Sequence, residues 1–274
     1  MRPVHPQLTA RVEHGRSLPV LVWRFTEPRL CISSGPLGGG IGARDWLVNA
    51  TVPLNYDRTD PDHQLSEIGA ALGLAGAGCG LLTAVDVTRH HLGAEGSAQV
   101  TATVGLSSPA WAAVPDHHFR REAPHRVGTI NIVVAAPVRL SEAALVNAVA
   151  TATKAKAQAL HEAGIRATGT ASDAVVVHCP TDGAAEAFGG PRSTFGARRP
   201  AAGGARRRAR RRPVLDLGAR PQATGREPYA AKSFRAGFGG RLGTARGRPA
   251  GRSSGGRGRY RTADRWCVKP ELYH

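Results

Sequence analysis

The chain has 274 residues and a formal net charge of +17, and this charge is concentrated towards one end. Residues 1–197 contain 16 basic and 16 acidic residues, whereas residues 198–274 contain 21 basic and four acidic residues, an excess of 17. The high isoelectric point therefore says nothing about the neutral front part, which is long enough to bury a substantial core.

The composition also argues against secretion and membrane insertion. No apolar segment of signal-peptide type follows the opening residues, and no apolar run approaches the length that spans a bilayer. The four cysteines lie far apart without a CxxC pair: Cys31, Cys79, Cys179 and Cys267. This spacing favours reduced cysteines in a cytoplasmic protein over a zinc ribbon or a disulfide framework.

Short β-branched runs alternate with two helical patterns along the front part. Residues 1–17 are expected to be an N-terminal lead-in, with a domain at 18–197. The expected strands are residues 20–25 and 30–33, separated by a turn at Pro28, and then 46–52, 81–87, 99–105, 128–134 and 174–177. A first helix is expected at Leu65–Leu74, with Asp60 as its cap and Pro61 at its first position.

The second helix is the clearest element of the sequence. Ser141 is a good N-cap, and Gly164 supplies the stop. Apolar residues recur at helical spacing between them, so Leu145 and Leu160 should face a sheet. A second stripe that includes Asn147, Lys154 and Gln158 should face away from it. The helix lies between two buried strands in a βαβ-like unit, and the fold class predicted is α+β, a mixed β-sheet with packed helices.

The histidines do not form a recognisable metal site. The adjacent pairs His90-His91 and His117-His118 lack the helical or paired-cysteine spacing that organises zinc. No protein-bound metal is therefore expected, and His63 is expected at the surface. Residues 107–126 have the composition of a long surface loop, which is typical of a lid.

The composition changes at residue 198. The 77 residues from there include 19 Arg and 13 Gly, with no sustained apolar period, so a disordered tail is expected. Nucleic-acid binding is one interpretation, but the aromatic residues are sparse and irregular. Arg, Gly, Ala and Pro have GC-rich codons, so a shift of reading frame is the favoured explanation.

Small polar residues cluster where the strands around the second helix end. Thr129 and Asn131 lie at one strand, and Thr168, Thr170 and Asp173 precede the other. Such residues often serve only as turns and caps. The same hydroxyl, amide and carboxylate groups are also the material of an active site, and both interpretations remain open on this pattern.

A glycine-rich loop at residues 36–42 follows the strand that ends near Ser33. It lacks the Gly-Lys-Ser/Thr of a phosphate-binding loop, so it does not indicate a nucleotide site. Either a tight turn or a close approach to a bulky ligand can explain it.

Several strings closely resemble adenosylcobinamide amidohydrolases, in the same order along the chain. They are SSGPLGGGIG at 33–42, GTINIVV at 128–134, LSEAALVNAVATATKAKAQAL at 140–160, ATGTASDAVVV at 167–177 and GPRS at 190–193. The resemblance covers about residues 18–197. It implies hydrolysis of the amide that joins aminopropanol to the corrin ring of adenosylcobinamide, for cobamide salvage.

The resemblance, with the needs of amide cleavage, selects the candidate residues. Asp173 or Asp86 would activate or orient water, Asn131 would support the oxyanion, and threonine hydroxyls would donate hydrogen bonds or attack. The full catalytic set is Asp173, Asp86, Thr129, Asn131, Thr168, Thr170 and Lys156. The substrate-binding set is Ser34, Gly38, Gly39, Gly40, Asn49 and Thr83. No cofactor is expected, because the cobalt belongs to the substrate.

One departure from the family pattern concerns the second helix. Glu is expected where this chain has Lys154, two residues before Lys156. The change would impair turnover if that Glu is catalytic, and would matter little if it is a solvated helix residue. The alternative functions are a non-catalytic corrinoid-binding protein or nucleic-acid binding through the tail. The expected partner is a small corrinoid, with no membrane and no specific nucleic acid, and a homo-oligomer is compatible with the sequence.

Overall fold

Strand β2 (Arg16–Ser33) is the longest strand of the computed structural model, which describes residues 4–95, 97–113 and 128–193. It lies near the middle of an eight-stranded mixed sheet with the order β4-β3-β2-β8-β7-β6-β5, and β1 also pairs with β2. Two helices pack on this sheet, which confirms the α+β class. The other elements are β1 (Gln7–Glu13), β3 (Gly40–Thr51), α1 (Pro61–Ala71), β4 (Gly78–Thr83), the short 3-10 helix η1 (Val87–Arg89), β5 (His91–Glu95), β6 (Ala98–Val104), β7 (Ile130–Ala135), α2 (Glu142–Glu162) and β8 (Ala174–Pro180).

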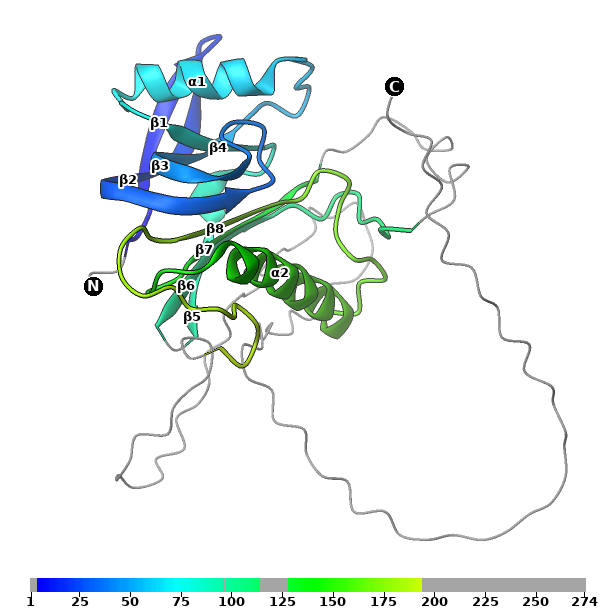
Figure 1. Ribbon diagram of the computed structural model, residues 1–274. Coiled ribbons are helices and arrows are strands. Elements are labelled where there is room, and N and C mark those ends of the chain that lie inside the picture. The colour runs from blue at the N-terminus through cyan, green and yellow to red at the C-terminus, as the bar shows by residue number, and fades with distance from the viewer. Residues whose placement is uncertain (1–3, 96, 114–127, 194–274) are drawn as a thin grey trace, which may run out of the picture. The chain divides into compact units, whose positions relative to one another are not determined.

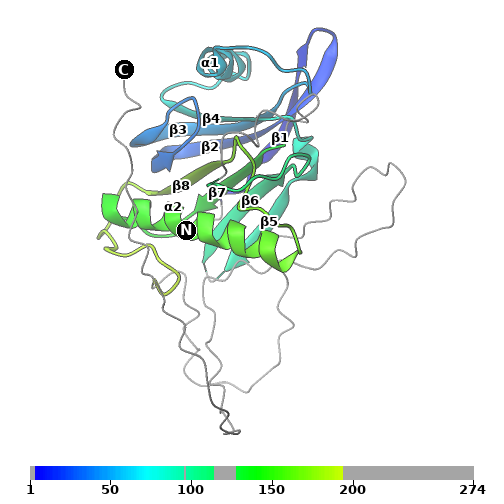
Figure 2. The same cartoon turned by 90° about the vertical axis from the view of Figure 1, so that its right-hand side faces the viewer.

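The sheet folds back on itself, so that its two halves enclose a shared core. Leu81 of β4 and Val133 of β7 belong to one buried cluster, although three strands separate β4 from β7 in the sheet order. Figures 1 and 2 show the half with β1–β4 facing the half with β5–β8. We call this buried cluster, which also contains Leu21, Trp23 and Val176, the inner core.

Each helix covers the outer face of one half of the sheet (Figure 1). Successive side chains of a strand point to opposite faces, so alternate residues separate the cores. On β2, Leu21 enters the inner core, whereas Val20 and Val22 pack with Leu65 and Ile68 of α1. The β5–β8 half packs in the same way against the alanine-rich face of α2.

Helix α2 begins and ends where the sequence predicts. Ser141 accepts a hydrogen bond from the amide of Ala144 at 3.2 Å, and Gly164 ends the helix with a φ of 76°. Leu145 and Leu160 are buried, as predicted, and Lys154 and Gln158 are exposed.

The rest of the polar stripe on α2 is partly covered, which the sequence does not predict. Asn147 is half-buried, because Gly190 packs close to its side-chain oxygen. Thr151 is buried and satisfies its hydroxyl by donating to the carbonyl of Asn147 at 2.9 Å. The segment that follows β8 therefore covers this side of the helix.

The prediction of two strands about a Pro28 turn is wrong. Strand β2 is continuous, and its pairing with β3 shifts register between Arg24 and Arg29. A register shift of this kind accommodates a residue without an N–H group, so Pro28 bends the strand without ending it. Two strands are not predicted by the sequence pattern: β1, which pairs with β2 across a His14-Gly15 turn, and the edge strand β5.

Helix α1 starts at Pro61, as expected, but ends at Ala71 and not at Leu74. Gly73 adopts a φ of 66°, and the amide of Leu74 donates to the carbonyl of Gly69 at 2.9 Å, which closes the helix end. Asp60 makes no side-chain cap. Its carboxylate binds the guanidinium of Arg58 at 2.7 Å, and this bond lowers the pKa of Asp60 to about 2.

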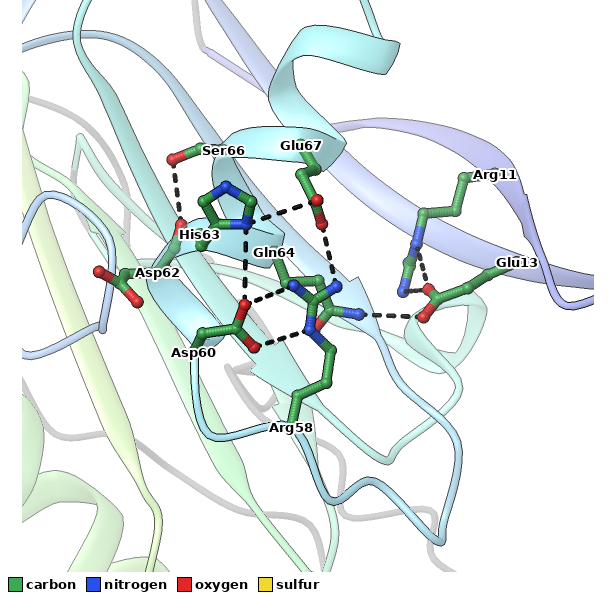
Figure 3. A network of polar contacts seen from close by, with 9 residues as sticks. All are labelled: Arg11, Glu13, Arg58, Asp60, Asp62, His63, Gln64, Ser66 and Glu67. Carbon is green, nitrogen blue, oxygen red and sulfur yellow. Dashed lines mark hydrogen bonds and ion pairs between the residues drawn. The ribbon is translucent and has the colours of Figure 1, made fainter.

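Polar contacts attach α1 to the β1–β2 hairpin (Figure 3). Gln64 donates to Glu13 at 3.1 Å, and Arg11 forms an ion pair with the same carboxylate at 2.8 Å. Arg58 also binds Glu67 at 2.9 Å. His63 is exposed, as predicted.

Several predictions fall outside the described residues. They concern most of the loop at 107–126, the tail from 198, and His117, His118 and Cys267. Cys31, Cys79 and Cys179 are buried free thiols. Within residues 4–95, 97–113 and 128–193, no three His, Cys, Asp or Glu side chains gather as a metal site would require, and no helix is long and apolar enough to cross a membrane.

Candidate functional site

The ammonium of Lys156 on α2 forms an ion pair with Asp173, directly before β8. The side chains are only 11% and 9% exposed, so both charges lie largely out of water. A buried pair of this kind holds its two groups in fixed positions, because neither charge is stable there alone. The sequence analysis predicted both residues as site residues, and the structure brings them together.

Asp173 is saturated with hydrogen bonds. Its Oδ1 accepts from the amide of Ile130 at 3.0 Å and from the hydroxyl of Thr170, and its Oδ2 accepts from the amide of Thr170 at 3.0 Å and from Lys156. The carboxylate thus joins the start of β7, the loop before β8 and helix α2. With all four acceptor positions used, it is better suited to positioning Lys156 than to taking a proton from water.

Gly169 lies directly against this ion pair. A Cβ atom at this position would overlap Asp173 Oδ2 and lie 2.6 Å from Lys156 Nζ. Only glycine therefore lets the loop at 168–170 pass over the pair.

Two hydroxyl groups meet beside the pair. Thr129 Oγ1 lies 2.7 Å from Ser172 Oγ, and Ser172 Oγ also donates to the carbonyl of Gly128 at 3.4 Å. Thr129 is buried, whereas Ser172 is exposed. Ser172 is not among the residues predicted for the site, although its place directly before Asp173 was a usable signal.

A buried amide network continues the site into the inner core. Asn131 Nδ2 donates to Asn49 Oδ1 and to the carbonyl of Leu82, both at 2.9 Å, and Asn49 Nδ2 donates to Thr103 at 3.0 Å. Both N–H groups of Asn131 are thus committed, and this argues against the expected donation to an oxyanion. Its Oδ1 is buried without a hydrogen-bond partner among the described residues, so the atom that it offers to a ligand is an acceptor.

Thr168 fixes the segment that precedes the 114–127 gap. Its hydroxyl accepts from the amide of Ala112 at 2.8 Å, and its own amide donates to the carbonyl of Ala110 at 3.0 Å. The amide of Ala110 in turn donates to the carbonyl of Gly169 at 2.8 Å. Thr168 therefore organises backbone around the site.

The glycine loop is held as a turn against β4. The carbonyl of Gly38 accepts from Arg44 at 3.0 Å, and a Cβ at Gly38 would overlap the carbonyl of Gly78. Gly38 and Gly40 have positive φ values of 64° and 77°, and Gly39 is exposed between them. Ser34, just before the loop, accepts from the amide of Val175 at 3.0 Å, and so lies close to the start of β8.

Asp86 and Thr83 perform local structural roles. The predicted strand 81–87 ends at Thr83, because its hydroxyl accepts from the amide of Val85 at 3.1 Å and turns the chain. The exposed Asp86 then caps η1 by accepting from the amide of Thr88 at 2.9 Å. Its carboxylate accepts from Thr88, and no hydrogen bond within the described residues joins it to the Lys156–Asp173 pair.

A second buried polar residue, His178, lies farther along β8. Its ring packs 5.0 Å from the ring of Phe25, and neither nitrogen has a hydrogen-bond partner among the described residues. Burial lowers the pKa of His178 to about 3, and the charge of Arg29 contributes to the decrease. The imidazole is therefore neutral at physiological pH.

The chain is similar to proteins of a known family. Residues 5–203 match the family model described as adenosylcobinamide amidohydrolase. The chain belongs to this family. Two relatives carry that name. A protein of Methanosarcina mazei is 35% identical over 146 residues, which cover 53% of this chain and 67% of the relative. A protein of Halobacterium salinarum is 35% identical over 176 residues, which cover 61% of this chain and 73% of the relative.

As a member of the adenosylcobinamide amidohydrolase family, the chain is an amidohydrolase. The position at which Glu was expected, Lys154, lies away from the site. Lys154 is exposed, whereas Lys156, two positions later on α2, meets Asp173. Residues two apart on a helix point in nearly opposite directions, so this geometry favours the interpretation of position 154 as a solvated helix residue.

Proposed function

We propose that the chain hydrolyses the amide that joins the aminopropanol arm to the corrin ring of adenosylcobinamide. The products would be adenosylcobyric acid and aminopropanol, which suits a role in cobamide salvage. The observation that carries the proposal is the Lys156–Asp173 pair, held at the ends of β7 and β8 in a member of this amidohydrolase family.

The proposed chemistry begins at the amide carbonyl. Water adds to the carbonyl carbon and the C–N bond breaks. Both protons of the water pass to the leaving nitrogen, which gives a carboxylate and an ammonium group. Asp173 uses only one of the three N–H groups of Lys156, so the ammonium can donate to the carbonyl oxygen as it gains negative charge. Lys156 is the residue to which we assign stabilisation of the oxyanion.

Asp173 acts in this scheme as a positioning residue. Its bonds to Ile130 and Thr170 fix the carboxylate, and the carboxylate fixes the ammonium. The paired hydroxyls of Thr129 and Ser172 orient the attacking water, since Ser172 is exposed and next to Asp173. The unpartnered Oδ1 of Asn131 accepts from an N–H group of the substrate.

The test compares two lysines of one helix. The full chain and its Lys156→Met and Lys154→Met variants are incubated with adenosylcobinamide, and released aminopropanol is quantified. We expect Lys156→Met to lower kcat by about 100-fold or more, the usual effect of losing an oxyanion donor. Lys154→Met should leave kcat unchanged, because its side chain is exposed.

Two outcomes would contradict the proposal. No aminopropanol from the unaltered chain would remove the substrate assignment, and corrinoid binding without release would favour the non-catalytic alternative. Full activity of Lys156→Met would remove the assigned role of Lys156. Unfolding curves of both variants, with the assay run well below their midpoints, separate loss of chemistry from loss of fold.

A further inference from the structure

Trp111 is an exposed tryptophan next to the site. Its side chain is 50% exposed, whereas Trp23 and Trp46 are 1% and 6% exposed. Its large exposed aromatic surface is available for contact with a ligand, and tryptophan is enriched at binding surfaces.

The backbone on both sides of Trp111 is fixed to the loop that builds the site. Ala110 exchanges hydrogen bonds with Thr168 and Gly169, at 2.8 Å for its amide and 3.0 Å for its carbonyl. On the other side, the amide of Ala112 donates to the hydroxyl of Thr168 at 2.8 Å. Trp111 thus lies between two anchored residues, although its side chain is exposed.

The same loop lies against the Lys156–Asp173 pair. Gly169, whose carbonyl binds Ala110, is so close to the pair that an added Cβ would lie 2.6 Å from Lys156 Nζ. One short stretch of backbone therefore separates Trp111 from the charged centre. A ligand with one part at Lys156 and a broad face beside it lies within reach of the indole.

We propose that the indole of Trp111 is a stacking platform for a planar π face of the corrinoid substrate, next to the Lys156–Asp173 pair. The inference rests on the proposed function and adds the residue that holds the bulk of the substrate. The part of the substrate that stacks on the indole is a flat, conjugated surface, which is either the corrin ring or the adenine of the adenosyl group. Binding by stacking acts on the whole substrate and not on the reacting bond, so it affects affinity more than turnover.

The experiment compares Trp111→Ala, Trp111→Phe and a control, Phe188→Ala, in the full chain. Phe188 is the other exposed aromatic residue within the described ranges, also 50% exposed, and it lies beside Gly190. KM and kcat are measured with adenosylcobinamide, and Kd is measured by equilibrium dialysis with adenosylcobinamide and with cobinamide that lacks the adenosyl group.

For Trp111→Ala we expect KM and Kd to rise by about tenfold with kcat within about twofold, as the loss of one aromatic stacking contact predicts. Trp111→Phe should recover part of the affinity, and Phe188→Ala should change neither constant. An equal rise in Kd for adenosylcobinamide and for cobinamide assigns the contact to the corrin ring. Weakening of the adenosyl form alone assigns it to the adenine.

Unchanged KM and Kd in Trp111→Ala would overturn the inference while leaving the proposed function intact. A fall in kcat at constant KM, without rescue by Phe, would overturn it as well, because that pattern indicates a structural role. If the unaltered chain binds corrinoids but releases no aminopropanol, the proposed function fails and the dialysis result still decides the role of Trp111. If it neither binds nor hydrolyses them, both fail.

Discussion

Replacing Asp173 by Asn tests whether this carboxylate organises the site. Each of its oxygens accepts two hydrogen bonds, Oδ1 from Ile130 and Thr170 Oγ1, and Oδ2 from the Thr170 amide and Lys156. An Asn side chain has one acceptor oxygen and one NH2 group. Two of the four donors would therefore face this NH2 group, which cannot accept a hydrogen bond from them. Lys156, 11% exposed, would also lose its counter-charge.

The expected cost follows from these losses. Removing one partner of a buried ion pair costs about 3–5 kcal/mol, and the lost hydrogen bonds are part of that figure. With a urea m-value of about 2 kcal/mol/M, the unfolding midpoint should fall by about 2 M. Without urea the variant should remain folded, but aminopropanol release should still be lost, because Lys156 is no longer held in position.

Asp86→Asn is the matched control. Asp86 is exposed and caps η1 by accepting from Thr88, and Asn is an equally good cap. Its free energy of unfolding should change by less than about 0.5 kcal/mol. The two variants are compared by urea unfolding followed by circular dichroism. An Asp173→Asn midpoint within about 0.3 M of the unaltered chain would refute the assigned organising role.

Three further predictions follow from the packing. Leu160→Ala should lower the free energy of unfolding by about 2–5 kcal/mol, because Leu160 is buried between α2 and the sheet; an unchanged urea midpoint would contradict this. Gly169→Ala should abolish aminopropanol release, since the added Cβ overlaps the Lys156–Asp173 pair. In Gly164→Ala, where no atom lies within 4 Å of the added Cβ, the free energy of unfolding should fall but turnover should not. His178 has a pKa below its unfolded value, so its contribution to stability is fully present above about pH 6.5 and declines as the pH falls towards 3. Between these pH values, His178→Leu should reduce the slope of the free energy of unfolding against pH by up to about 1.4 kcal/mol per pH unit. If the plots of this free energy against pH are parallel for the variant and the unaltered chain, His178 does not titrate with unfolding.

The elements that the sequence predicted well are those specified by local pattern. Helix α2 has its cap, its stop and its apolar stripe within 24 residues, and all three agree with the structure. Predictions failed where a local signal was outweighed by pairing with distant strands. Pro28 indicates a turn by itself, but pairing of β2 with β3 resumes at Arg29, where pairing with β8 also begins, so the strand continues beyond it.

The site was predictable only in part, for a related reason. Thr170 and Asp173 are close in sequence, so their contact could be expected. The contact between Asn49 and Asn131 joins residues 82 positions apart and depends on the fold of the sheet. Strand patterns do not specify that curvature, so the commitment of both Asn131 N–H groups could not be foreseen. Asp86 was predicted as a candidate for activating water, and in the structure its carboxylate caps η1, a role to which a carboxylate after a strand is equally suited.

The position of β8 has a consequence for how the chain is made. This strand is the last of the described strands in sequence, yet it lies between β2 and β7 and pairs with both. Until residues 174–180 leave the ribosome, residues 29–33 of β2 and 131–135 of β7 each present an open edge that can pair with another nascent chain. The two halves of the sheet have to wait for the strand that joins them, so folding should be slow and should not be completed until that strand has been synthesised. Expression at low temperature, or with chaperones that shield strand edges, should therefore raise the soluble yield more than further stabilisation of the finished protein would.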